Sequence, residues 1–142
     1  MNRAGTRSRA AALLALLLTA GCGGAPVCNS RVEGTVRLDG VPLGGVRVEF
    51  VPDVASGVAA PSSSALTDEN GHFRLTFGDD RPGAVVGRHR VVVIVGRGEA
   101  RPRGVKVPLV YAIAAQTPLR VEVTPDGHTY DVALSRNPQA AP

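Results

Sequence analysis

The run Asp68-Glu69-Asn70-Gly71 and three histidines contain the residue types best suited to chemistry in this chain of 142 residues. Carboxylate and amide oxygens beside a glycine could bind calcium, a hard cation that takes about six to eight oxygen ligands. The run is too short for a calcium loop, because an extended segment resumes after it and no glutamate stands at the far position. We therefore predict a tight turn. A calcium site that adds Asp79 and Asp80 stays open, but it is not predicted.

The three histidines, His72, His89 and His128, could together hold zinc or copper, because imidazole suits both metals. None stands two or four residues from another, so no single strand or helix places two of them on one face. We expect three separate histidines at the surface or at strand ends. No grouping of serine, histidine and acid stands out either, although such a triad is assembled in space. The sequence predicts no catalytic residue, no metal and no cofactor.

Basic side chains gather in one loop that spans Gly96 to Val107. Against a single acid, Glu99, this loop carries four basic residues: Arg97, Arg101, Arg103 and Lys106. It could hold an anionic lipid head group or an acidic polysaccharide, and Tyr111 nearby could stack on a sugar ring. The favoured alternative is a solvated loop without a ligand, with Tyr111 packed between sheets.

The first 21 residues have the pattern of an export signal. Arg3, Arg7 and Arg9 lie in a basic start, residues 11–18 are apolar, and small residues follow up to Cys22. The apolar run is roughly half the length of a transmembrane helix, so we expect residues 1–21 to be removed.

The segment Thr19-Ala20-Gly21-Cys22 resembles the bacterial lipoprotein box, in which the signal is cut before a cysteine that becomes lipid-modified. The resemblance implies acyl chains on Cys22 that hold the protein to a membrane, and it leaves Cys28 as a single thiol. The alternative is an ordinary secretory signal, in which case Cys22 and Cys28 could close a small loop. Gly23 replaces the aspartate that keeps some lipoproteins at the inner membrane, so a cell-envelope location at the outer membrane or periplasmic face is favoured.

Charge excludes a nucleic-acid partner. The chain has 16 Lys and Arg against 12 Asp and Glu, and removing the three signal arginines leaves 13 against 12. An excess of one is no footprint for nucleic acid. The mature length suits one domain. We expect a lipidated cysteine and tether at 22–30, the domain at 31–134 and a flexible tail at 135–142.

Alternation of apolar and polar residues predicts strands along the whole domain. The clearest strand follows the 68–71 turn and places Phe73, Leu75 and Phe77 on one face, which predicts a hairpin with the segment before the turn. Val91 to Val95 is apolar on both faces and predicts the most central strand. Residues 52–64 lack periodicity, so we expect a loop that crosses between sheets or is mobile. Together these segments predict a single antiparallel β-sandwich of about seven strands.

The order of these motifs resembles the carboxypeptidase regulatory-like domain, a transthyretin-like β-sandwich. The resemblance spans about Arg31 to Leu134, and its motifs are Val32–Val36, Leu38–Leu43, Val46–Phe50, Thr67–Phe73 and Gly87–Val91. It implies an accessory module that stabilises, positions or binds. With the lipoprotein box, it implies a membrane-anchored, non-catalytic structural or protein-interaction role, with other envelope proteins or glycans as partners.

The transthyretin-like fold also includes a ring-opening hydrolase of purine breakdown, which is the remote alternative. That family relies on a Tyr-Arg-Gly-Ser ending, whereas this chain reads Asp131 to Pro138 without it. We therefore expect no enzyme, and fold analogy alone does not supply a function.

Overall fold

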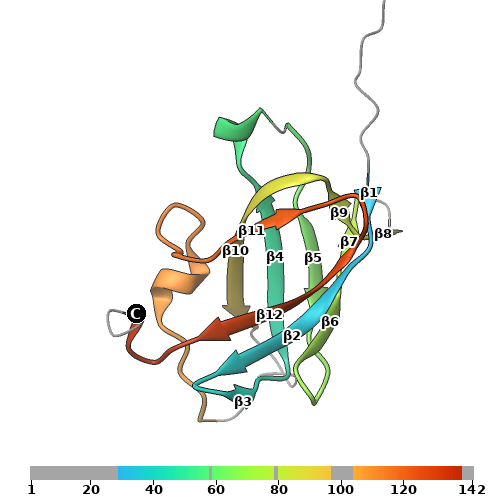
Figure 1. Ribbon diagram of the computed structural model, residues 1–142. Coiled ribbons are helices and arrows are strands. Elements are labelled where there is room, and N and C mark those ends of the chain that lie inside the picture. The colour runs from blue at the N-terminus through green and yellow to red at the C-terminus, as the bar shows by residue number, and fades with distance from the viewer. Residues whose placement is uncertain (1–28, 58, 79, 97–103, 139–142) are drawn as a thin grey trace, which may run out of the picture.

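The computed structural model describes residues 29–57, 59–78, 80–96 and 104–138, and over these ranges the chain forms a β-sandwich without an α-helix (Figure 1). The larger sheet has six strands in the order β11-β10-β4-β5-β7-β8. In that order, their bounds are Arg120–Val123, Gly87–Val95, Val46–Pro52, Ser63–Leu66, Thr76–Phe77 and Arg81–Pro82. The predicted all-β sandwich is confirmed.

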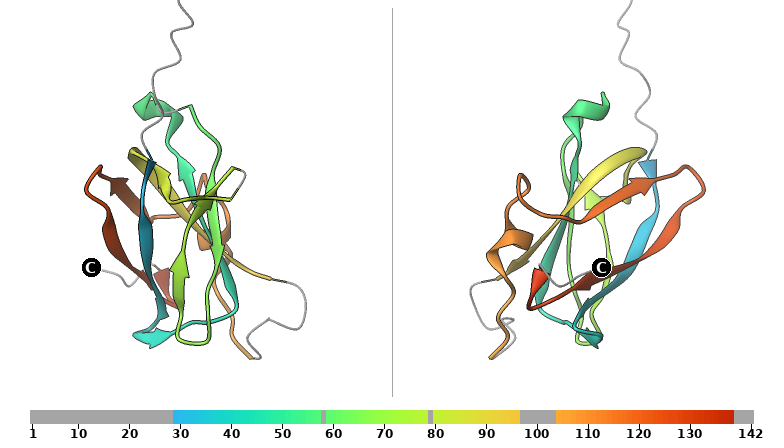
Figure 2. Two further views of the ribbon diagram at one scale, coloured as in Figure 1. Left: turned by 90° about the vertical axis from the view of Figure 1, so that its right-hand side faces the viewer. Right: turned by 60° about the vertical axis from the view of Figure 1, so that its left-hand side comes forward.

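The smaller sheet has four strands centred on β2. They are β12 (His128–Leu134), β2 (Val32–Leu38), β3 (Val41–Pro42) and β6 (His72–Arg74). A separate short pair joins β1 (Asn29–Ser30) to β9 (Ala84–Val85). Two 3₁₀ turns, η1 (Val54–Ser56) and η2 (Leu109–Ala112), lie in the connections. Turning the molecule by 90° shows the two sheets as separate layers (Figure 2, left).

The core lies between the layers because the longer strands β2 and β4, and the segment that contains β6 and β7, alternate buried and more exposed residues. The predicted faces are confirmed on the segment after the 68–71 turn, where Phe73, Leu75 and Phe77 are at most 3% exposed and the residues between them are exposed. The same alternation buries three large apolar side chains on β2 and three on β4: Val32, Val36, Leu38, Val46, Val48 and Phe50.

Strand β10 is covered on both faces over Val91 to Val93, each at most 3% exposed. That part of the prediction is confirmed, and η2 packs against the same strand. Its predicted position as the most central strand is wrong, because β4 and β5 occupy the middle of the larger sheet and β10 is second from the edge. Burial on both faces comes from layers above and below, so it does not report how many strands lie alongside.

The predicted hairpin around the 68–71 turn forms only in part. Away from the turn, β5 pairs with β7, with Ser64 opposite Thr76. Near the turn, β6 separates from β5 and pairs with β2 of the other sheet, with Phe73 opposite Gly34. Leu75 lies at the switch and donates its N–H to the Val32 carbonyl at 3.0 Å. One extended segment therefore contributes to both sheets.

The connection between β4 and β5 stays within one sheet. The two strands are antiparallel neighbours, with Phe50 opposite Ser63. Of the two alternatives for residues 52–64, a crossing between sheets is therefore wrong. The described part of this loop contains η1, which begins with Asp53 accepting a hydrogen bond from the Ala55 N–H at 3.3 Å.

The pairing of β12 with β2 is parallel, which departs from the predicted all-antiparallel sandwich. The turn after β11 lies beside the beginning of β2. A hydrogen bond shows this: the hydroxyl of Ser30, two residues before β2, donates to the carbonyl of Pro125 in that turn at 3.3 Å. Strand β12 thus begins at the end where β2 begins, and His128 pairs with Val32. Both strands then run in the same direction.

The described chain starts at one end of the sandwich and makes its 68–71 turn at the other (Figure 1). Asn29 pairs with Val85, just before β10 begins. At the opposite end, Val95 at the end of β10 pairs with Val46, whose carbonyl accepts the Thr67 N–H at 2.9 Å. In the described residues, no helix combines the length and hydropathy needed to span a membrane.

Candidate functional site

Most of the residues proposed from the sequence for ligand binding lie outside the described residues. The three residues outside are Arg97, Arg101 and Arg103. The proposed lipidation site, Cys22, and the second cysteine, Cys28, also lie outside the described residues. Lys106 is described and exposed.

Tyr111 is not placed to stack on a sugar ring. It belongs to η2, is 3% exposed, and its hydroxyl accepts a hydrogen bond from the Ser135 N–H at 3.1 Å. The packed position, one of the two alternatives for this residue, is therefore the one found. Tyr111 therefore offers no exposed ring on which a sugar could stack.

His89 contradicts the expectation of histidines at the surface or at strand ends. His72 and His128 are exposed, but His89 lies within β10 and is only 1% exposed. Its Nδ1 donates to the Gly87 carbonyl at 2.9 Å, and its ring centroid lies 6.0 Å from that of Phe50. Burial lowers the pKa of His89 below 6.5, while the hydrogen bond to Gly87 acts in the opposite direction.

The alternation of β10 could have revealed this burial from the sequence. His89 is two residues before Val91 and four before Val93, so it shares their inward face. The described residues contain no group of three or more His, Cys, Asp or Glu side chains that could hold a metal.

The Asp68 carboxylate is used to build the predicted turn. Its Oδ1 accepts the N–H groups of Asn70 and His72 at 2.8 and 2.9 Å. The Gly71 N–H donates to the Asp68 carbonyl at 3.0 Å, and Gly71 has a φ of +75°, which favours glycine. The prediction of a turn is confirmed, and its geometry presents Asp68 and His72 to the surface.

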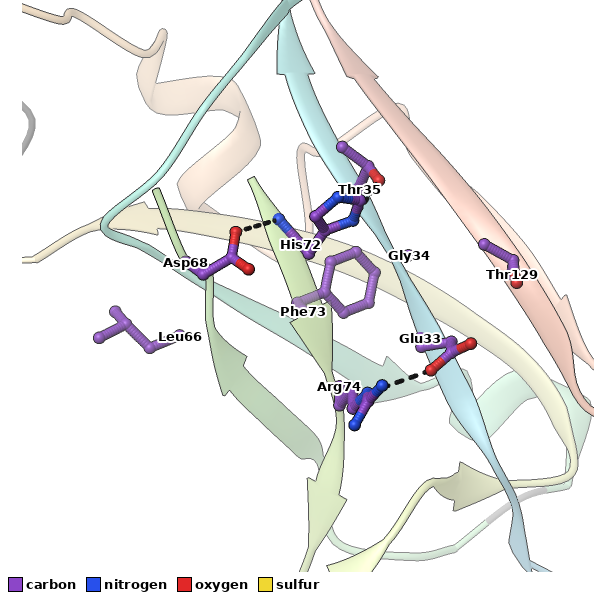
Figure 3. A pocket seen from close by; sticks show the side chains of 9 residues that line it. All are labelled: Glu33, Gly34, Thr35, Leu66, Asp68, His72, Phe73, Arg74 and Thr129. Carbon is purple, nitrogen blue, oxygen red and sulfur yellow. Dashed lines mark hydrogen bonds and ion pairs between the residues drawn. The ribbon is translucent and has the colours of Figure 1, made fainter. Parts of the chain in front are cut away.

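A hollow of about 730 Å³ lies beside this turn, on the exposed side of the smaller sheet (Figure 3). Strands β2, β5, β6 and β12 and the turn after β5 supply the residues that line it: Glu33, Gly34, Thr35, Leu66, Asp68, His72, Phe73, Arg74 and Thr129. Gly34 and Phe73 are the buried members of this set, and the polar side chains lie around them.

The register between β2 and β6 places polar side chains of the two strands opposite each other. Glu33 is opposite Arg74, whose Nε donates to Glu33 Oε2 at 3.2 Å. Thr35 is opposite His72, with Thr35 Oγ1 and His72 Nδ1 3.0 Å apart. Each pair is exposed, so neither is a strong source of stability, but each places its two polar side chains next to each other across the strands.

Two smaller hollows adjoin the first. One, of about 350 Å³, includes Arg31, Glu33 and Arg74, and the other, of about 280 Å³, includes Arg31, Glu33 and Thr129. Glu33 lines all three hollows. We call the three together the β2 groove, because each is lined by residues of β2 or by Arg31 just before it.

Thr35 and His72 are placed like a nucleophile and a base, which raises the question of catalysis. A triad also needs a third group that orients the base. Among the described residues, none bonds the second ring nitrogen of His72, and the Asp68 carboxylate contacts only backbone N–H groups. The arrangement can donate and accept hydrogen bonds, but it lacks the orienting acid of a triad.

Comparison of the chain with protein-family models, curated proteins and solved structures found no match. The chemistry of the β2 groove is therefore argued from its geometry. The sequence indicated the exposed faces of β2 and β6 but not their adjacency. That adjacency arises where β6 leaves the hairpin, and no local pattern marks the switch.

Proposed function

We propose that this protein is a lipid-anchored β-sandwich of the cell envelope, held to a membrane through Cys22, with a non-catalytic structural or protein-interaction role. We also propose that its domain is of the carboxypeptidase regulatory-like kind, because its strand motifs resemble those of that family. The proposal also includes a location at the outer membrane or the periplasmic face.

The observation that best supports a membrane anchor at Cys22 is the short distance in sequence between Cys22 and the folded domain. The first described strand, β1, begins at Asn29, seven positions after Cys22 (29 − 22 = 7). Its Ser30 is 3% exposed and pairs with Ala84, which secures the start of the domain. A lipid on Cys22 would hold such a domain close to the bilayer, and several acyl chains make the attachment firm.

The β2 groove supports a role in interaction. Its charged side chains lie on the exposed face of a sheet, and its histidine and threonine lack an orienting acid among the described residues. Exposed polar side chains held by cross-strand pairs suit recognition of another molecule.

Metabolic labelling with an alkynyl palmitate analogue tests the anchor. We expect the unaltered chain and the Cys28→Ser variant to be labelled, and the Cys22→Ser variant to lose the label. The Cys28 variant is the matched control, because it removes the other cysteine of the chain. An unlabelled wild type, or equal labelling of the Cys22→Ser variant, would refute the lipid anchor.

A further inference from the structure

We infer that the β2 groove binds a neutral, hydroxyl-rich ligand of the size of a short oligosaccharide. This inference goes beyond the proposed role, and it depends on the groove alone, not on the lipid.

The first argument is the extent of the groove. Arg31 and Glu33 each line both smaller hollows, and Glu33 and Arg74 join one of these to the largest hollow. From Arg31, just before β2, to Thr35 within it, an extended chain rises roughly 13 Å, at about 3.3 Å per residue. The surface is therefore elongated and suits a chain of linked rings better than one compact molecule.

The second argument is unused hydrogen-bonding capacity. Arg74 donates through Nε to Glu33, and no described residue bonds its two terminal nitrogens or the second carboxylate oxygen of Glu33. The same holds for His72 Nε2 and for the second carboxylate oxygen of Asp68. The groove thus presents donors and acceptors a few residues apart, on side chains that each already make at least one hydrogen bond (Figure 3). A hydroxyl group both donates and accepts, so a polyol can satisfy both kinds.

The third argument is charge. The three hollows contain two arginines, Arg31 and Arg74, and three acids, Glu33, Asp68 and Asp126, which sum to −1 with neutral histidines (2 − 3 = −1). An anion would meet the carboxylates and a cation would meet the guanidinium groups. Near balance of charge with both signs interspersed favours a neutral ligand.

The pairing of β2 argues against an extended peptide that adds a strand to β2 in the groove. Peptides commonly bind by adding a strand at a free sheet edge. Strand β2 has β12 on one side and β3 and β6 on the other, so its backbone groups are already used. A ligand on this face must bond side chains, as a sugar does.

Amide NMR titration of the full chain in detergent tests the inference, with maltohexaose, cellohexaose and hexa-N-acetylchitohexaose as neutral probes and an oligogalacturonate as the acidic probe. We expect at least one neutral probe to bind and to shift the amides of residues 33–35 and 72–74. Arg74→Ala and Glu33→Ala should each weaken that binding about tenfold, because each removes charge-assisted hydrogen bonds. Arg136→Ala is the matched control, since Arg136 is also exposed and forms an ion pair, with Asp39 at 2.6 Å, away from the groove.

Four results would overturn the inference: no binding of any neutral hexasaccharide, binding of the acidic probe alone, equal affinity in the Arg74→Ala and Arg136→Ala variants, or shifts confined to residues outside the groove. None of these results would change the outcome of labelling at Cys22, so the ligand and the anchor are tested separately.

Discussion

His89 is a titratable side chain inside the core, so its protonation is linked to folding. Burial lowers its pKa in the folded state below 6.5, the ordinary value it regains when the chain unfolds. As pH falls below about 6.5, the unfolded state binds the proton more readily than the folded state does, and the free energy of unfolding decreases. The contribution of the neutral His89 imidazole to the free energy of unfolding is therefore fully present above about pH 6.5. It is lost as the pH falls towards the lowered pKa of His89 in the folded state.

Urea unfolding at pH 7.5 and pH 5 measures this linkage. We expect the wild type to lose stability between the two pH values, and the His89→Gln variant to lose less, because glutamine carries no titrating proton. His72→Gln, at an exposed position, should behave like the wild type. An unchanged pH dependence in His89→Gln would contradict the linkage.

Two buried hydroxyl groups differ in whether they are satisfied. Ser63 is 1% exposed and its hydroxyl has no hydrogen-bond partner among the described residues. Thr67 is 4% exposed, and its Oγ1 donates to the Leu43 carbonyl at 2.9 Å and accepts the Val46 N–H at 3.0 Å. An unsatisfied buried group is costly, whereas a satisfied one stabilises the fold.

Ser63→Ala should therefore leave the free energy of unfolding unchanged or raise it, whereas Thr67→Val should lower it by about 1–3 kcal/mol. Chemical denaturation of both variants provides the comparison. A larger loss for Ser63→Ala than for Thr67→Val would show that the Ser63 hydroxyl has a partner that stabilises it.

At the scale of elements, strand positions and faces could be predicted because their pattern repeats every two residues. The partner of each strand could not be predicted, because pairing depends on residues far apart in sequence. Strand β6 leaves β5 for β2 near Leu75, and β12 runs parallel to β2 because its turn ends beside Ser30. The β2 groove results from the first of these non-local pairings, so the alternation pattern could not predict that the groove residues lie together.

The two faces of β6 make a direct test of the element assignments. Phe73 is 2% exposed and its ring lies 6.2 Å from that of Phe50, so Phe73→Ala should cost roughly 3–5 kcal/mol. Arg74 has an 87% exposed side chain, and Arg74→Ala should cost under about 1 kcal/mol. Thermal and urea unfolding measure both, and similar losses at the two positions would mean that the faces are wrongly assigned.

At the scale of the whole molecule, a lipid on Cys22 would orient the sandwich. A tether of seven positions extends at most about 25 Å, and it joins the domain at the end that carries β1. Strand β10, nine residues and roughly 30 Å long, separates that end from Lys106, which follows the far end of the strand. With the proposed lipid in place, this arrangement would disfavour Lys106 as a contact for lipid head groups and would point the far end of the sandwich away from the membrane.

Intact mass spectrometry of the chain extracted from membranes tests the proposed attachment most directly. The account predicts a mature chain that begins at Cys22 and carries the added mass of acyl chains on that residue. A mature chain with unmodified Cys22, or one that begins at another residue, would contradict it.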